Sequence, residues 1–130
     1  MCIRDRTGSA APAYRWRVST VSTPTGPEAR DGGYADLRGY AAIGDGRTVA
    51  LIARDGRIDW LPVPALAARP MFAAVLDEER GGHFALRPDE PFTTEREYIE
   101  GTNVLRTRFT TASGVVQVTD ALVTLSLIHI

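Results

Sequence analysis

The stretch Thr48-Val49-Ala50-Leu51-Ile52-Ala53-Arg54-Asp55-Gly56-Arg57-Ile58-Asp59-Trp60-Leu61 decides the fold class of this chain. Residues 48–53 form a short apolar run that is rich in β-branched side chains, as in a strand. Asp55-Gly56 is typical of a tight hairpin turn, because such turns need positive φ. The next residues alternate in polarity, which places Ile58 and Trp60 on one face and Asp59 on the other. The sequence therefore predicts a β-hairpin here.

More strands are predicted towards the C-terminus, at residues 83–87, 92–99, 103–111 and 115–122. Residues 70–76 instead predict a short helix, because Pro70 suits a first helical turn and Phe72, Val75 and Leu76 recur at helical spacing. Short strands separated by frequent turns are typical of a sandwich or barrel. We therefore expect an all-β, mainly antiparallel fold: an incomplete β-sandwich with one short helix near residues 70–76.

The two ends of the chain are encoded by one DNA sequence read on opposite strands. Back-translating residues 125–130 as CTG TCT CTT ATA CAC AT gives a reverse complement that encodes residues 1–6. This DNA resembles the mosaic end used in transposase-based sequencing libraries, and a natural inverted repeat is the alternative. We expect residues 1–6 and 125–130 to be adapter-derived and exclude them from the fold. On this interpretation the natural chain is a metagenomic fragment of a longer protein.

Residues 7–37 are rich in Ser, Thr, Pro, Gly and Ala without clear periodicity, which predicts a disordered leader or linker. The ordered domain is expected at residues 38–124. With 44% hydrophobic and 24% charged residues, the composition is that of an ordinary soluble domain. A net charge of −1 favours neither nucleic acid nor an anionic membrane as a partner. No uncharged apolar run is long enough to span a membrane. A cytoplasmic location is the default expectation.

Several sequence blocks follow one another in the order of a known family. The longest is Gly39-Tyr40-Ala41-Ala42-Ile43-Gly44-Asp45-Gly46-Arg47-Thr48-Val49-Ala50-Leu51-Ile52-Ala53-Arg54-Asp55-Gly56-Arg57-Ile58-Asp59-Trp60-Leu61. Shorter blocks are Phe72-Ala73-Ala74-Val75-Leu76-Asp77, Gly81-Gly82-His83-Phe84, Thr102-Asn103-Val104-Leu105 and Gly114-Val115-Val116-Gln117-Val118-Thr119-Asp120. Together they resemble the N-terminal domain of bacterial glycoside hydrolase family 15 proteins, which are glucoamylase- and trehalase-like enzymes. The resemblance covers residues 38–124.

The resemblance implies a β-sandwich domain that precedes a catalytic (α/α) barrel. In the family, one glutamate of the barrel acts as general acid and another as general base, with inversion at the anomeric carbon. Neither motif occurs in this sequence, so the fragment alone is expected to be inactive. The implied partners are the barrel of the same chain and an α-glucoside substrate, trehalose or a starch-like glucan. After Trp60 the chain departs from the family pattern W-L-C, P-R-F-D-S-P-S, and the Arg and Asp of that loop have no match.

Four residues are candidates for a position near the substrate or the domain interface: Asp59, Trp60, Asp45 and Arg47. Asp45 and Asp55 precede glycines, so the structural alternative is that their carboxylates bond local backbone in turns. Asp59 is expected either to orient an arginine or to face the missing barrel. Trp60 is expected either to pack in the core or to stack on a sugar ring.

No catalytic residue, metal site or cofactor is predicted in the fragment. His83 has no second ligand at metal spacing, and the single Cys excludes a Cys-based zinc site. The alternative to a hydrolase domain is a stand-alone β-sandwich that binds carbohydrate or protein without catalysis, with Trp60, Phe92 and Tyr98 as candidate contacts. A strand scaffold without any ligand is the third interpretation.

Overall fold

The structure is a computed structural model of the chain, and it describes residues 2–4 and 30–123. Most of the predicted leader and both the start and the end of the chain lie outside these residues. The described elements are almost entirely antiparallel strands, and the one helical element is a single 3-10 turn, η1, at Leu37–Gly39. The strands are β1 (Cys2–Arg4), β2 (Ala41–Gly44), β3 (Val49–Ile52), β4 (Arg57–Pro62), β5 (Pro70–Phe72), β6 (Phe84–Ala85), β7 (Phe92–Tyr98), β8 (Leu105–Thr111) and β9 (Val115–Asp120).

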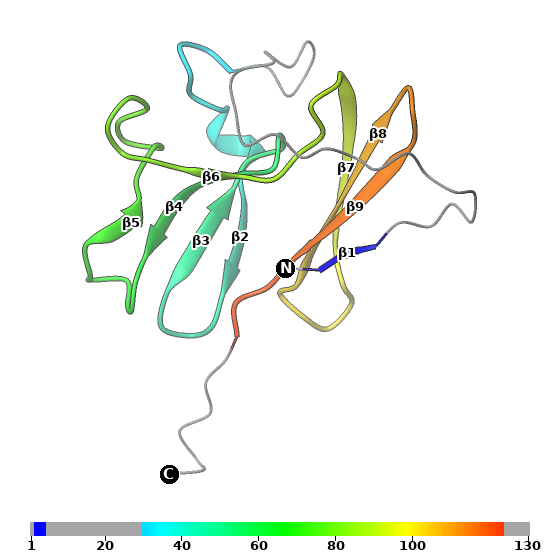
Figure 1. Ribbon diagram of the computed structural model, residues 1–130. Coiled ribbons are helices and arrows are strands. Elements are labelled where there is room, and N and C mark those ends of the chain that lie inside the picture. Colours follow the sequence, from blue (N-terminus) through cyan, green and yellow to red (C-terminus); the bar gives the residue numbers. More distant parts are fainter. Residues whose placement is uncertain (1, 5–29, 124–130) are drawn as a thin grey trace.

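The strands form two sheets (Figure 1). One sheet has the order β1-β9-β8-β7, and the other has the order β2-β3-β4-β5 with β6 also paired to β4. The all-β prediction is confirmed, and the predicted strands are present, most of them one to three residues shorter than expected. Ile43, Ala50 and Ile52 from the second sheet pack with Leu105 from β8 in one buried cluster. The inner faces of the two sheets therefore share a core.

The predicted hairpin is β3 and β4. Its loop is closed by two backbone bonds: the Gly56 amide donates to the Ala53 carbonyl, and the Ala53 amide donates to the Arg57 carbonyl. Gly56 has a φ of +80°, and a Cβ on it would lie 2.8 Å from the Leu86 carbonyl oxygen. Only glycine combines this φ with so close an approach.

One detail of the hairpin prediction is wrong. Ile52 pairs with Ile58 and Leu51 pairs with Trp60, so β4 contains one residue more than β3 across this interval, which is Asp59. The result is a β-bulge, which breaks the alternation of side chains. Ile58 packs on the core cluster, whereas Trp60 shares the outer face of the sheet with Leu51.

The predicted helix at residues 70–76 is also wrong. Pro70–Phe72 is the short strand β5, which pairs with the end of β4. Seven residues are too few to nucleate an isolated helix, and pairing with a free strand edge satisfies the backbone instead. The chain then turns back tightly, so that a Cβ on Gly81 would lie 2.3 Å from the carbonyl carbon and oxygen of Ala73. Leu76, predicted to pack on the sheet, is 72% exposed.

The two sheets are joined along one side, where β7 lies beside β2. The Tyr98 hydroxyl accepts a hydrogen bond from the Ala42 amide and donates one to the Ala42 carbonyl. Arg96 donates to the backbone carbonyls of Ile52 and Gly39. The Asn103 side chain donates to the Gly44 carbonyl. Side chains of β7 and of the β7–β8 loop thus satisfy backbone groups of η1, β2 and the end of β3.

Candidate functional site

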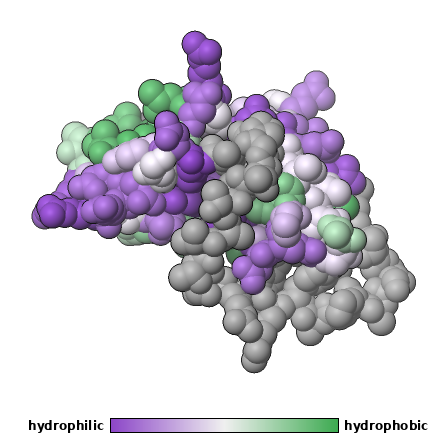
Figure 2. Space-filling view, turned by 90° about the horizontal axis from the view of Figure 1, so that it is seen from above, coloured by the Kyte–Doolittle hydropathy of each residue, from purple (hydrophilic) through white to green (hydrophobic). Residues whose placement is uncertain are grey.

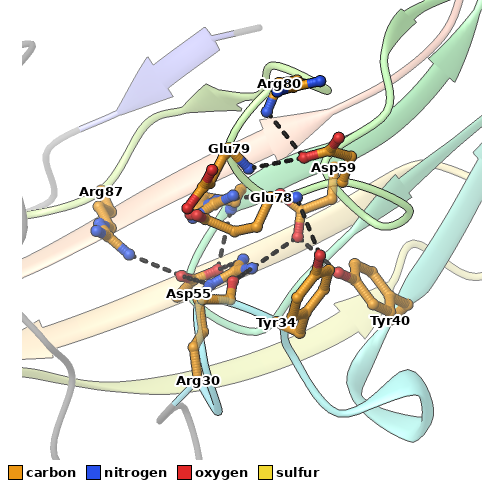
Figure 3. Close-up of polar contacts among 12 residues, drawn as sticks. Arg30, Tyr34, Tyr40, Asp55, Asp59, Glu78, Glu79, Arg80 and Arg87 are labelled. Atoms are coloured by element: carbon orange, nitrogen blue, oxygen red, sulfur yellow. Dashed lines mark hydrogen bonds and ion pairs between the residues drawn. The ribbon is translucent and has the colours of Figure 1, made fainter.

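Seven side chains form a charged cluster in the second sheet and the loops around it, and we call it the Asp55–Asp59 cluster. They come from segments far apart in the sequence: Arg30, Tyr40, Asp55, Arg57, Asp59, Glu78 and Arg87. Three arginines meet three carboxylates, so the cluster is balanced in formal charge. Figure 3 shows Arg30 and Arg87 approaching the same carboxylate, Asp55, from different parts of the chain.

Asp55 occupies the hairpin loop and is 2% exposed. Arg30 binds it with two nitrogens, at 2.7 Å from Nε to Oδ2 and 2.8 Å from Nη2 to Oδ1. Arg87 adds a contact of 2.7 Å to Oδ2. Burial by itself raises the pKa of this carboxyl, but the hydrogen bonds and charge of Arg30, with the charge of Arg87, outweigh it and hold the pKa below the ordinary value of 3.8. Asp55 is therefore kept ionised.

Asp59 is fully buried at the bulge of β4. It accepts hydrogen bonds from Nη1 of Arg30 at 2.8 Å, from Nε of Arg57 at 3.0 Å and from the hydroxyl of Tyr40 at 2.6 Å. Burial, together with the hydrogen bond to Asp59, raises the pKa of Tyr40. Arg57 and Asp59 are two residues apart on β4, and side chains at that spacing lie on the same face of a strand. The expectation that Asp59 orients an arginine is confirmed; that it faces a missing barrel stays a prediction.

The outer members of the cluster connect it to a surface turn. Nη1 of Arg57 lies 3.4 Å from Oε1 of Glu78, and Nη2 of Arg57 is buried without a partner among the described residues. The Glu78 amide donates to the hydroxyl of Tyr34. His83 lies at the surface, where the partial loss of water around its ring and the positive charge of Arg57 lower its pKa.

The cluster is suited to holding segments together and unsuited to acid–base catalysis. A general acid needs a carboxyl whose pKa is raised towards neutrality. Asp55 has the opposite shift, and both Asp55 and Asp59 already bind arginine. The described part of the chain contains no group of three His, Cys, Asp or Glu side chains that could hold a metal ion. Among the same residues, no helix is long and apolar enough to cross a membrane.

The structure separates the other sequence-predicted candidates from Asp59. Asp45 and Arg47 lie in the β2–β3 turn, at the opposite end of β3 from the Ala53–Gly56 loop. The Asp45 carboxylate accepts the amides of Arg47 and Thr48, which hold its pKa below 3.8. The structural alternative is thus confirmed for Asp45. For Asp55 it is confirmed by one bond, since the Arg57 amide donates to Oδ1 at 3.3 Å, but the shorter contacts of this carboxylate are with arginine side chains.

The sequence analysis singled out Asp55 and Asp59 but missed the other five members of the cluster, Arg30, Tyr40, Arg57, Glu78 and Arg87. Arg30 and Tyr34 were placed in the leader, yet Arg30 binds both Asp55 and Asp59, and the Tyr34 hydroxyl accepts a hydrogen bond from the Glu78 amide. The signal that could have found Arg30 is indirect: Asp55 and Asp59 carry two negative charges that Arg57 alone cannot balance. Buried carboxylates need such partners.

A small cavity of about 250 Å³ lies beside the junction of β2 and β7. Its lining includes Tyr40, Arg54, Arg96, Glu97 and Tyr98. Apart from Tyr98, which the binding-module alternative named, none of the sequence-predicted candidates lines it. Tyr98 and Arg96 already bond backbone groups there.

Comparison with known proteins identifies the family. Residues 35–127 match the family model described as "Trehalase-like, N-terminal". The chain belongs to the trehalase-like N-terminal family. It is 34% identical over 125 residues to a trehalase of Mycolicibacterium smegmatis, a match that covers 92% of this chain and 17% of the relative. It is also 37% identical over 70 residues to Trehalase 2 of Sulfolobus acidocaldarius, covering 54% of this chain and 12% of the relative.

A trehalase of Mycobacterium tuberculosis is 34% identical over 91 residues, covering 69% of this chain and 13% of the relative. No solved structure gives a significant match. The chain thus spans less than a fifth of the length of these trehalases. They are enzymes, and the matched segment is a small part of each.

Proposed function

We propose that this chain is the non-catalytic N-terminal β-domain of a longer, trehalase-like α-glucoside hydrolase of the family 15 type. The observation that carries the proposal is the match of residues 35–127 to a trehalase-like N-terminal domain, together with trehalase relatives of which the match covers only 12–17%. The charged cluster supports the non-catalytic role, because its carboxylates are neutralised by arginine.

The chemistry is proposed for the part of the parent enzyme outside this chain. There one carboxylic acid protonates the glycosidic oxygen as the C–O bond breaks, and a second carboxylate takes a proton from the attacking water. The water oxygen bonds to the anomeric carbon from the opposite face, so the configuration inverts. For trehalose, both products are glucose.

The role of the β-domain is to pack against the catalytic part and shape the entrance to its site. Support comes from β3, which is apolar on both faces: Ala50 and Ile52 are buried, while Val49 and Leu51 are half-buried on the other side. A strand that faces water on one side normally carries polar residues there. Trp60 shares this outer face, and Met71 of β5, 61% exposed, adds to the apolar surface nearby. Figure 2 shows hydrophobic residues gathered on the side of the molecule where β5 lies.

The test is to express the parent gene and assay the purified protein with trehalose, maltose and malto-oligosaccharides. We expect hydrolysis of an α-glucoside with β-glucose as the first anomer detected by NMR, and no hydrolysis by the 130-residue chain. Activity of the short chain alone contradicts the non-catalytic role. A parent gene without a downstream catalytic domain contradicts the hydrolase assignment.

The stand-alone binding module is not favoured by the relatives, which are trehalases. It makes a distinct prediction: tryptophan fluorescence of the 130-residue chain would change saturably on titration with trehalose or malto-oligosaccharides. The proposed domain role predicts no saturable change, because Trp60 then packs against protein.

A further inference from the structure

Asp120 is a buried carboxylate at the end of β9. Its residue is 8% exposed, and it pairs in register with Leu105, which is 1% exposed and part of the core. Val118, two residues earlier on the same strand, is also buried. Side chains two residues apart on a strand share a face, so Asp120 lies on the inner face of its sheet.

No hydrogen bond or ion pair reaches this carboxylate from residues 30–123. Burial raises the pKa of Asp120, and the positive charge of the amino terminus of the chain opposes this in part. That terminus belongs to the segment predicted to be adapter-derived. The domain itself therefore offers Asp120 no counter-charge within the described residues.

An ionised carboxylate buried without a partner is strongly unfavourable, and proteins normally pair such groups. The Asp55–Asp59 cluster follows that rule, with each buried aspartate bonded to two arginines. Asp120 departs from it in a chain that spans less than a fifth of its relatives' length. The lack of a partner for Asp120 is explained if its cationic partner lies in the part of the enzyme that this chain does not contain.

We propose that Asp120 binds a cationic side chain, a guanidinium or ammonium group, of the remainder of the parent enzyme and so fixes the β-domain against it. This inference rests on the proposed function, since it needs a longer parent. The complementary charge sets the chemistry of the partner: a positively charged, hydrogen-bond-donating group that reaches the inner face at the end of β9. Asp120 is a positioning residue and takes no part in the reaction.

The experiment compares Asp120→Asn in two proteins, the 130-residue chain and the full-length parent. In the short chain the substitution removes an unpaired buried charge, so the urea midpoint at pH 7 rises. Each unit by which folding raises the pKa of Asp120 corresponds to about a tenfold gain in the folding equilibrium constant. In the parent the same substitution removes one member of an ion pair, so the melting temperature falls. Asp89→Asn, the same change at an exposed aspartate, is the matched control and leaves both values unchanged.

Opposite signs in the two proteins support the proposal. An increase or no change in the parent overturns it, because no cation then meets Asp120. A decrease in the short chain also overturns it, since the carboxylate is then bonded within the domain. If the short chain gives no cooperative transition, the parent comparison against Asp89→Asn decides alone. The proposed function is tested by a separate assay: it fails if the wild-type parent does not hydrolyse α-glucosides.

Discussion

The Asp55–Asp59 cluster and Asp120 are two ways of burying a carboxylate in the same small domain. Asp55 and Asp59 are surrounded by Arg30, Arg57 and Arg87, all supplied by the chain itself. Asp120 is 8% exposed, against 2% for Asp55 and 0% for Asp59, and meets no such group among the described residues. The pKa of Asp55 is lowered and that of Asp120 is raised. The difference teaches that the second sheet is electrostatically complete on its own, whereas the end of β9 is not.

The largest effect is expected from removing the central carboxylate of the cluster. Asp59→Ala leaves Arg30 and Arg57 without their shared partner in a buried place. Breaking a buried ion pair in this way costs about 3–5 kcal/mol. We expect the free energy of unfolding, measured by urea denaturation, to fall by that amount. A loss below about 1 kcal/mol would mean that water enters the cluster and that the comparison with Asp120 is misplaced.

A smaller loss is expected for Arg30→Met, which keeps the length of the side chain but removes its charge. Arg30 donates to both aspartates, yet Arg87 still pairs with Asp55 and Arg57 still pairs with Asp59. Hydrogen bonds to charged groups contribute about 1.5–3 kcal/mol, and we expect a loss in that range in the same urea experiment. An unchanged midpoint would place Arg30 outside the folded domain, as the leader prediction had it.

The pH dependence of stability should show the two kinds of carboxylate separately. Asp120 has a raised folded pKa, so its contribution is full below 3.8 and is lost as the pH rises through the folded value. Asp55 has a lowered folded pKa, so its contribution is present above 3.8 and is lost as the pH falls through the folded value. From pH 7 downwards the urea midpoint should first rise and then fall below pH 4. In Asp120→Asn the increase of the urea midpoint on lowering the pH should disappear, while the decrease below pH 4 remains. An increase that persists in this variant would show that another group causes it.

The smallest effect is expected at the exposed pair of Arg106 and Glu97 on the outer face of the first sheet. Their side chains are 39% and 65% exposed, and Nη1 lies 3.0 Å from Oε1. Exposed pairs contribute about 0.2–1 kcal/mol and are screened by salt. A double-mutant cycle with Glu97→Gln and Arg106→Gln should give a coupling energy in this range that shrinks in 1 M NaCl. A larger, salt-independent coupling would show that burial is not what separates strong from weak pairs here.

The strand positions could be predicted because local signals were consistent. Asp55-Gly56 marked the hairpin loop, and alternation from Leu105 to Phe109 marked β8, where all three inward residues are buried. The bulge at Asp59 could not be predicted, since alternation of residue types continues through it and only the pairing register reveals it. Residues 70–76 were mistaken for a helix because pairing with β4 is a tertiary interaction that no local window contains.

The candidate site was predictable only in part. Asp59 was selected because it is a carboxylate on the strand face opposite Ile58, outside any Asp-Gly turn, and it does lie in the cluster. Asp45, Arg47 and Trp60 were also candidates, Asp45 as a carboxylate and Trp60 as an aromatic that suits a sugar face, but Asp45 and Arg47 lie in a turn and Trp60 lies on the outer face of the sheet. Arg30 and Arg87 are 25 and 32 residues from Asp55 in sequence, and nothing local marks them as its partners.

The Tyr98 hydroxyl beside β2 has a consequence for self-association. By both donating to and accepting from Ala42, it occupies the very groups that an incoming strand would use. The edge strands β2 and β7 are thereby bound to each other, so this side of the domain resists edge-to-edge pairing with another chain. The β9 edge differs, because it pairs with the backbone of Cys2–Arg4. This tripeptide is predicted to come from adapter DNA and not from the natural gene. Polymerisation of this domain, where it occurs, should begin at β9.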